Sequence, residues 1–427
     1  MIRLFEHHQK AYLALALLLS FAGFGFAWML LRNPGLPASQ SHGVTALTLV
    51  ALLAAYLFFI VRRRSTTTIP PLTTVLLGTV LLSIPLVLFS PLGSTDLYAN
   101  AYYGRLITVH HFNPYTISSA TTIHDVYFTH TLATAPFQST YGPAWLTFTA
   151  LVTSVTGEHI ALTLTVFRLL NLAALLAITA LLWSLPARNN LFRWAVLCVA
   201  WNPLVLFEAI QNGHNDVMML LCVVAALVAY EKRRAAYVLP LLLLGGLIKF
   251  VPWILLPLAC VAIWRRPTAV VQRAKTLLLS SAISVALLAA AFLPYWSGWH
   301  TFRELFLLGK FFALPPYHPI QWLSMLFHAF GATTSLAHGN AHVVGIALVV
   351  LGAIVLFVRL QKGTLILSTA AFILLTLFLF FGIVYIQPWY FLWLLLLIPL
   401  LPERQRVWAL VLATSIPLVT YPFFLNS

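Results

Sequence analysis

The sequence predicts an all-α polytopic membrane protein, and three observations support that prediction. Of its 427 residues, 61% are hydrophobic and 8% are charged, whereas a soluble domain carries about 25% charged residues. Mean hydropathy is +0.94. Apolar runs of roughly 17–25 residues, each able to cross a hydrocarbon core of about 30 Å, recur from end to end. Because no long hydrophilic block interrupts them, residues 1–427 are expected to form a single integral domain.

The net charge of +15 does not indicate nucleic-acid binding, because the basic residues are dispersed between the apolar runs. They form the groups Arg62-Arg63-Arg64, Arg188 with Arg193, Lys232-Arg233-Arg234, Arg265-Arg266, Arg359 with Lys362, and Arg404 with Arg406. Cytoplasmic loops of membrane proteins are enriched in Lys and Arg. These groups are therefore predicted to face the cytoplasm, as is the N-terminus, which carries Arg3 and Lys10.

The order of spans follows from these loops. Spans at 11–31, 44–61 and 70–90 place the next residues outside, and the first run is too long for a signal peptide. Residues 143–156 are read as a short helix that enters and leaves on the outer side. Further elements are spans at 160–185, 194–210 and 216–230, a broken pair over 235–264, and spans near 276–294, 342–359, 364–385, 388–401 and 407–424. The result is a bundle of about 11–13 transmembrane helices, with the C-terminus outside.

This topology collects the unusual polar segments on the outer face. They are an extracytoplasmic loop over 91–142, the turn 212–216, Lys249, a second extracytoplasmic loop over 295–340, and Gln387-Pro388-Trp389-Tyr390. A short amphipathic helix is expected in the first loop, after Asp96. No phosphate-binding glycine motif precedes a helix, so nucleotide binding is not supported. The three cysteines lie inside apolar runs and are read as core residues.

Asp96 is the strongest candidate for chemistry, because only nine residues of the chain are acidic and this one opens its longest polar stretch. One interpretation is a helix cap, since Asp is favoured at helix N-termini. The functional interpretation is a general base that takes a proton from an acceptor hydroxyl.

Polar residues elsewhere suggest substrate contacts. His214, Asn215 and Asp216 lie between two apolar runs and are expected to contact sugar or phosphate in a cavity, with capping of the following helix as the alternative. Lys249 either snorkels or faces an anion. With Arg105 and His318, it has the character of a phosphate site, because such side chains supply charge-assisted donors.

The histidines of the first loop do not predict a metal site. His110, His111, His124 and His130 lack the spacing that brings two ligands to one face of a helix, and we read them as ordinary polar loop residues. Neither a metal nor another cofactor is expected.

Several motifs resemble those of a known family. Asp96-Leu97-Tyr98, Asn113-Pro114-Tyr115 and Tyr141-Gly142-Pro143 resemble the first extracytoplasmic loop of the bacterial polyprenol-phosphomannose-dependent alpha-(1→6)-mannosyltransferases of the GT-C superfamily. Trp201-Asn202-Pro203-Leu204-Val205-Leu206 and Gly213-His214-Asn215-Asp216-Val217-Met218-Met219 resemble the same family's later signature. The motifs agree in order over residues 95–235, whereas the loop 295–340 has no clear counterpart.

The resemblance implies a GT-C-like bundle that works as a glycosyltransferase in the cell membrane, with its active site on the extracytoplasmic side. Mannose would move, with inversion, from a polyprenyl-phosphate donor to a glycan or glycolipid acceptor of the cell envelope. Asp96 would be catalytic, and Arg105, Lys249 and His318 would bind the donor phosphate. Substrate contacts would come from Tyr98, His110, Tyr115, Tyr141, His214, Asn215 and Asp216.

Two other classes remain open at this point. A lipid or solute transporter, or flippase, also has broken helices and an intramembrane Lys, although residues 1–210 and 211–427 show no internal repeat. An acyltransferase or ligase would use the same outer face with His110 or His111 as base. A glycosyltransferase should bring Asp96 and a cation together in one outer cavity.

Overall fold

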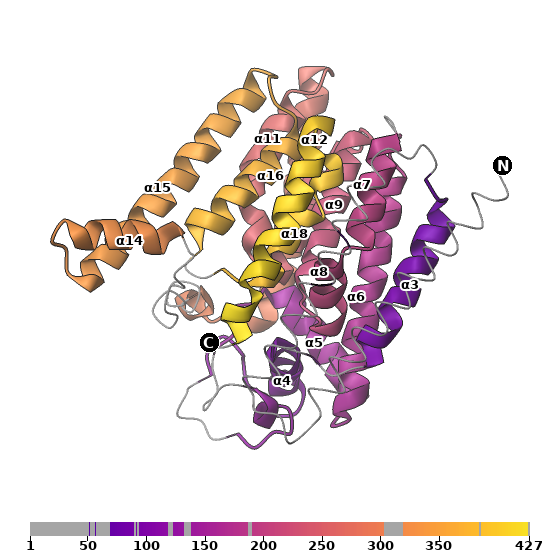
Figure 1. Ribbon diagram of the computed structural model, residues 1–427, viewed down its shortest axis with the longest axis vertical. Helices are drawn as coiled ribbons and strands as arrows, with labels where there is room; N and C mark the ends of the chain where they lie inside the picture. The colour runs from indigo at the N-terminus through magenta and orange to yellow at the C-terminus, as the bar shows by residue number, and fades with distance from the viewer. Residues whose placement is uncertain are drawn as a thin grey trace.

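The computed structural model describes Ala51, Tyr56, 69–88, Pro91, 94–117, 123–131, 138–186, 190–302, 319–383 and 386–425. All regular secondary structure in these residues is helical, which confirms the predicted all-α class (Figure 1). The expected span 11–31, most of the expected span 44–61, and His318 lie outside the described residues.

Three described helices are long and apolar enough to cross a membrane. They are α6 (Ile160–Trp183), the helix Val270–Tyr295 that contains α12 (Val270–Phe292), and the stretch Leu336–Gln361 of α15 (Thr334–Gln361). The most apolar window of α6 is 44% buried, whereas those of α12 and α15 are 17% buried. In a membrane, α12 and α15 would therefore present most of their apolar surface to lipid, whereas α6 packs more extensively against other helices.

A fourth candidate span is bent by 42°. It consists of α7 (Asn190–Ala200), α8 (Pro203–Leu206) and a π-helical turn, η2 (Phe207–Gln211). Asn202 begins the second part, since its side-chain oxygen accepts hydrogen bonds from the backbone N–H of Leu204 and Val205 at 2.9 and 3.3 Å. Proline at the first helical position completes this start.

The other described helices are not candidate spans by length and composition. They include α3 (Leu72–Leu88), α9 (Asp216–Glu231), α10 (Val238–Ile248), η4 (Val251–Leu255), α11 (Leu256–Trp264), α16 (Leu367–Leu377) with η8 (Phe378–Gly382), η9 (Pro388–Phe391), α17 (Leu392–Leu395) and η10 (Ile398–Leu400), followed by α18 (Glu403–Leu425). The expected break within 235–264 occurs at Lys249, whose backbone is extended (φ −149°, ψ 121°). The number of spans, about 11–13, stays a prediction.

The two loops expected from the sequence contain helices. The first holds α4 (Asp96–Thr108), which packs against α5 (Pro143–Thr156), the short helix predicted at 143–156. The second holds η6 (Gly298–Phe302), α14 (Pro319–Ala329) and the beginning of α15, which starts before the expected residue 342. That earlier start is explained by Thr333, whose side chain caps the helix by accepting from the N–H of Leu336.

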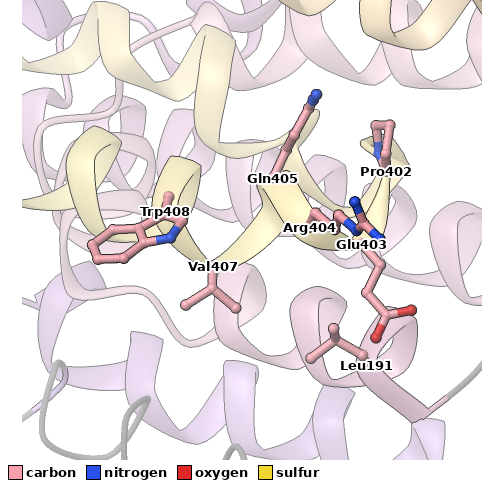
Figure 2. Close-up of a pocket in the computed structure, with 7 residues that line it drawn as sticks. All are labelled: Leu191, Pro402, Glu403, Arg404, Gln405, Val407 and Trp408. Carbon is pink, nitrogen blue, oxygen red and sulfur yellow. The ribbon is translucent and has the colours of Figure 1, made fainter.

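Several of the described basic groups lie at one end of the bundle, whereas Arg62-Arg63-Arg64 and Arg188 lie outside the described residues. Arg265 donates to the carbonyl of Leu360 at 3.2 Å, and Arg406 lies over the ring of Phe192 at 5.4 Å. A surface depression at this end is lined by Leu191, Pro402, Glu403, Arg404, Gln405, Val407 and Trp408 (Figure 2). Helix α4 lies at the opposite end, the lower part of Figure 1. The fold therefore separates the basic loops from the segment that contains Asp96.

Candidate active site

Three charged side chains from separate segments meet at the beginning of α4. The Nδ1 atom of His214 lies 3.4 Å from Oδ2 of Asp96, and its Nε2 atom lies 3.3 Å from Oε2 of Glu208. The side chain of Asp96 is 34% exposed, whereas those of His214 and Glu208 are 1% and 0% exposed. Asp96 is therefore the member of this trio that a substrate can reach.

Asp96 does not cap α4. The helix begins at Asp96 itself, its N-cap residue Thr95 makes no side-chain capping bond, and the Asp96 backbone N–H donates to Ser94 Oγ at 3.2 Å. The carboxylate turns instead toward His214 and Tyr141. The capping interpretation is therefore wrong, and the carboxylate is available for another role.

His214 reaches Asp96 because the turn before it is tightly held. Gly213 has a φ of +68°, and a Cβ there would lie 2.7 Å from the side chain of Leu97 in α4. Such a positive φ favours glycine. From α6, the Asn171 side chain donates to the carbonyls of Ala209 and His214 at 2.9 and 3.1 Å. The turn is thereby fixed to both α4 and α6.

Glu208 enters the trio from the π-helical turn η2. Its Oε2 atom accepts a hydrogen bond from Asn212 Nδ2 at 2.9 Å. Single π turns inside helices occur frequently at functional sites. The turn places a carboxylate in an otherwise apolar candidate span. A charge in such a position costs free energy unless it is paired with an opposite charge.

An aromatic ring covers the histidine. Trp389 of η9 stacks on His214 with ring centroids 3.9 Å apart and an interplanar angle of 15°. An indole face attracts a cationic ring. Trp389 comes from the last third of the chain, so the site is built from segments that are far apart in sequence.

The charges of Asp96 and His214 stabilise each other. Burial alone would raise the pKa of Asp96, but the hydrogen bond and charge of His214, the charge of Lys249 and the hydrogen bond of Tyr141 hold it below its ordinary value. Burial alone would lower the pKa of His214, but hydrogen bonds and charges of Asp96 and Glu208 raise it to about 9. At neutral pH, Asp96 is therefore a carboxylate and His214 an imidazolium.

Tyr141 is positioned by the glycine that follows it. The backbone N–H of Gly142 donates to the carbonyl of Ile248 at 3.0 Å, at the end of α10. A Cβ at residue 142 would lie 2.1 Å from the carbonyl oxygen of Leu247. The Tyr141-Gly142-Pro143 motif thus allows two backbone segments to touch and brings Tyr141 to Asp96.

Asp216 and Lys249 form a second charged pair close to the trio. Lys249 Nζ lies 2.8 and 3.0 Å from the two carboxylate oxygens of Asp216, and Trp393 Nε1 donates to Asp216 at 2.6 Å. Lys249 also lies over the rings of Tyr390 and Trp393 at 4.6 and 5.7 Å. The charge of Lys249 acts on Asp96, and that of Asp216 on Tyr141. Four predicted groups, Asp96, Tyr141, Asp216 and Lys249, therefore share one neighbourhood with His214.

Arg105 and His110 are held in a separate cluster around Asp125. Arg105 donates to Asp125 at 2.6 Å and to Glu158 at 3.2 Å, and His110 Nε2 lies 2.9 Å from Asp125. Burial would raise the pKa of Asp125, but these hydrogen bonds hold it below its ordinary value. Arg105 and His110 thus each contact a protein carboxylate, and they lie in a different cluster from Asp96.

The remaining predicted residues lie around these clusters. Tyr98 stacks on His130 with centroids 5.0 Å apart, and the Tyr115 hydroxyl donates to the carbonyl of Tyr141 at 2.7 Å. The side-chain amide nitrogen of Asn215 is buried without a hydrogen-bond partner among the described residues. It is an unused donor beside Asp216.

Sequence reasoning missed Glu208 and Trp393 as members of the site, and it placed the segment with Trp389 on the outer face without giving Trp389 a role. Glu208 carried a usable signal, because an acidic residue inside an apolar run marks a functional position by default. Trp393 carried none, since aromatic residues are common wherever a helix meets lipid.

A helical membrane protein that gathers Glu208 and Asp216 close to the partly exposed carboxylate of Asp96 has the features of a membrane enzyme. The comparisons identify the class as glycosyltransferase. A family model described as "Alpha-(1->6)-mannopyranosyltransferase, N-terminal domain" matches residues 11–266. The chain belongs to this family.

One curated relative is similar over part of the chain. Alpha-(1->6)-mannopyranosyltransferase A of Corynebacterium glutamicum is 27% identical over 162 residues, which are 36% of this chain and 31% of that protein. The match therefore spans about a third of the length of the relative. No solved structure matches the chain.

Proposed function

We propose that the protein transfers mannose from a polyprenyl-phosphate donor to a glycan or glycolipid acceptor on the outer face of the cell membrane, with inversion at the anomeric carbon. The observation that carries this proposal is the partly exposed Asp96 carboxylate, kept ionised by buried His214 in the neighbourhood of Lys249. Membership of the mannosyltransferase family supports the choice of sugar.

In the proposed reaction, the acceptor hydroxyl oxygen attacks the anomeric carbon of the donor sugar. The bond from that carbon to the phosphate oxygen breaks, and its electron pair leaves with the polyprenyl phosphate. Asp96 takes the hydroxyl proton as general base. A beta-linked donor would give an alpha product, because direct displacement inverts the centre.

The leaving phosphate needs positive charge more than a proton, since it is already a stable anion. We assign Lys249 to this role, with Arg105 and His318 as further predicted partners. Lys249 is 16% exposed and paired with Asp216, so a phosphate would approach a cation that is already held in place. Tyr98, Tyr115, Tyr141, Asn215 and Asp216 are proposed to contact the sugars.

The base assignment is tested by Asp96→Asn. Asparagine keeps the shape of aspartate but cannot take the proton, so transfer from labelled polyprenyl-phosphate mannose in isolated membranes should fall about 10²–10⁴-fold. Glu403→Gln, an equivalent loss of charge in the depression of Figure 2 at the opposite end of the bundle, should retain normal transfer. Normal activity of Asp96→Asn would exclude Asp96 as the base, and movement of intact donor lipid without sugar transfer would indicate a transporter.

A further inference from the structure

Glu208 is a buried carboxylate, and one described residue supplies the positive charge beside it. Its side chain is 0% exposed, and among the described residues His214 is the cationic side chain within ion-pair distance. Removing one partner of a buried ion pair leaves an uncompensated charge, which is strongly destabilising. The position of Glu208 therefore favours a protonated His214.

The side chain of His214 is enclosed by protein. One ring nitrogen faces Asp96, the other faces Glu208, and Trp389 stacks on the ring. Only 1% of its side chain is exposed. An imidazolium has two donors and no acceptor, so each ring nitrogen of His214 can direct a proton toward one carboxylate. The Nε2 atom lies 3.3 Å from Glu208 but makes no hydrogen bond among the described residues, so that contact is an ion pair.

We propose that Glu208 and His214 are positioning residues for Asp96. Glu208 holds the imidazolium of His214 in one orientation, and His214 presents an ionised Asp96 to the acceptor hydroxyl. This inference rests on the proposed role of Asp96 as base, and it gives His214 a function different from the direct substrate contact predicted from the sequence. Trp389 stabilises the same imidazolium through its ring face.

Deprotonation of His214 would disturb this arrangement. A neutral imidazole has one donor and one acceptor, so one of its nitrogens would then face a carboxylate without a proton between them. Within the part of the chain that the structure describes, Lys249 after α10 and Tyr141 before α5 also act on Asp96. Tyr103 of α4, Asp216 of α9 and Tyr390 of η9 act in turn on Tyr141. Transfer should consequently have an alkaline limit set by His214.

Glu208→Gln tests the proposal through the pH profile of transfer. Asn212 donates to the same oxygen of Glu208 that faces His214, so the glutamine oxygen should occupy that position and the main change is the loss of charge. An opposite charge at this distance shifts a pKa by about 1–3 units. The alkaline limit should fall by about 1–3 pH units, while Glu403→Gln should keep the wild-type profile.

His214→Gln provides a second test if Glu208→Gln does not accumulate. It removes the imidazolium, so the alkaline limit due to His214 should disappear, and the acid limit should rise by about 1–3 pH units because Asp96 loses its cation.

The positioning role would be overturned if the acid and alkaline limits of transfer were unchanged in both variants while Asp96→Asn was inactive. Asp96 would then remain the base. An active Asp96→Asn would instead refute the proposed function on which the inference rests. The proposal would also be overturned if the variants accumulated to the wild-type level but lost the same fraction of the transfer rate at every pH. That result would show a structural role alone.

Discussion

The few acidic side chains of this protein are its most informative residues. Asp96, Asp125, Glu208 and Asp216 each have a cationic side chain within 3.4 Å. In an apolar chain each carboxylate must be paired or neutralised, because burying a lone charge is very costly. The ion pairs therefore hold particular loops and helices together, and they also place charged groups in the candidate active site.

The Asp216–Lys249 pair should hold α9 to the break after α10. Asp216→Asn leaves Lys249 without its counter-charge, and breaking a buried pair costs about 3–5 kcal/mol. The midpoint of thermal unfolding in detergent should fall clearly. The double variant Asp216→Asn/Lys249→Met should recover part of that loss, while sugar transfer remains impaired in both. An unchanged midpoint in Asp216→Asn would show that the pair does not stabilise the fold.

The sequence predicted some residues of the candidate site but not the partner of each charged group. Asp96, His214, Asp216 and Lys249 stand out because a polar side chain beside an apolar run needs an explanation, and the structure brings them together. Arg105 has the same signal, yet it pairs with Asp125, because the sequence shows where a charge lies along the chain but not which opposite charge the fold brings to it.

At the scale of elements, turns and helix breaks place more of the candidate site residues than the long helices do. The sequence predicted a short helix at 143–156 and a break near Lys249, since Gly, Pro and polar residues interrupt the apolar pattern there. It did not predict the π turn at 207–211, because a π turn differs from an α turn by the hydrogen-bond partner and leaves composition unchanged. It is this turn that carries Glu208.

Gly142→Ala should disrupt the contact between the segment before α5 and the end of α10. The new Cβ would meet the carbonyl oxygen of Leu247 at 2.1 Å, and overpacking of this kind costs about 1–3 kcal/mol. Transfer should fall, because Tyr141 would move away from Asp96. Purified variants should be compared by transfer rate and by thermal unfolding.

The matched control is Gly339→Ala in α15, where a Cβ would meet nothing within 4 Å. Alanine is the better helix former by about 1 kcal/mol, so this variant should be as stable as the wild type or slightly more so. Equal behaviour of the two variants would show that the close approach at residue 142 is not required.

At the scale of the molecule, two ends differ in charge and in content. The basic loops lie at one end, and α4 with the Asp96 trio lies at the other (Figure 1). Helix α6 runs from one end to the other and contacts α4 and α7 (Figure 1). If the basic end faces the cytoplasm, the candidate site faces outward.

Single cysteines at three exposed positions test this orientation. His111→Cys should react with an impermeant maleimide on intact cells, whereas Lys232→Cys and Arg404→Cys should react only after permeabilisation. The native cysteines Cys198 and Cys222 are buried and Cys260 is partly buried, so background labelling should be low. The reverse pattern would put the candidate site in the cytoplasm and contradict the outer-face proposal.

Trp389 has a consequence for the design of chimeric proteins. The family model matches residues 11–266, whereas the indole that covers His214 and the one that binds Asp216 come from residues 389 and 393. The matched region therefore lacks two side chains of the candidate site. A chimera that replaces the last third of the chain would have to keep an aromatic ring in register over the imidazole of His214.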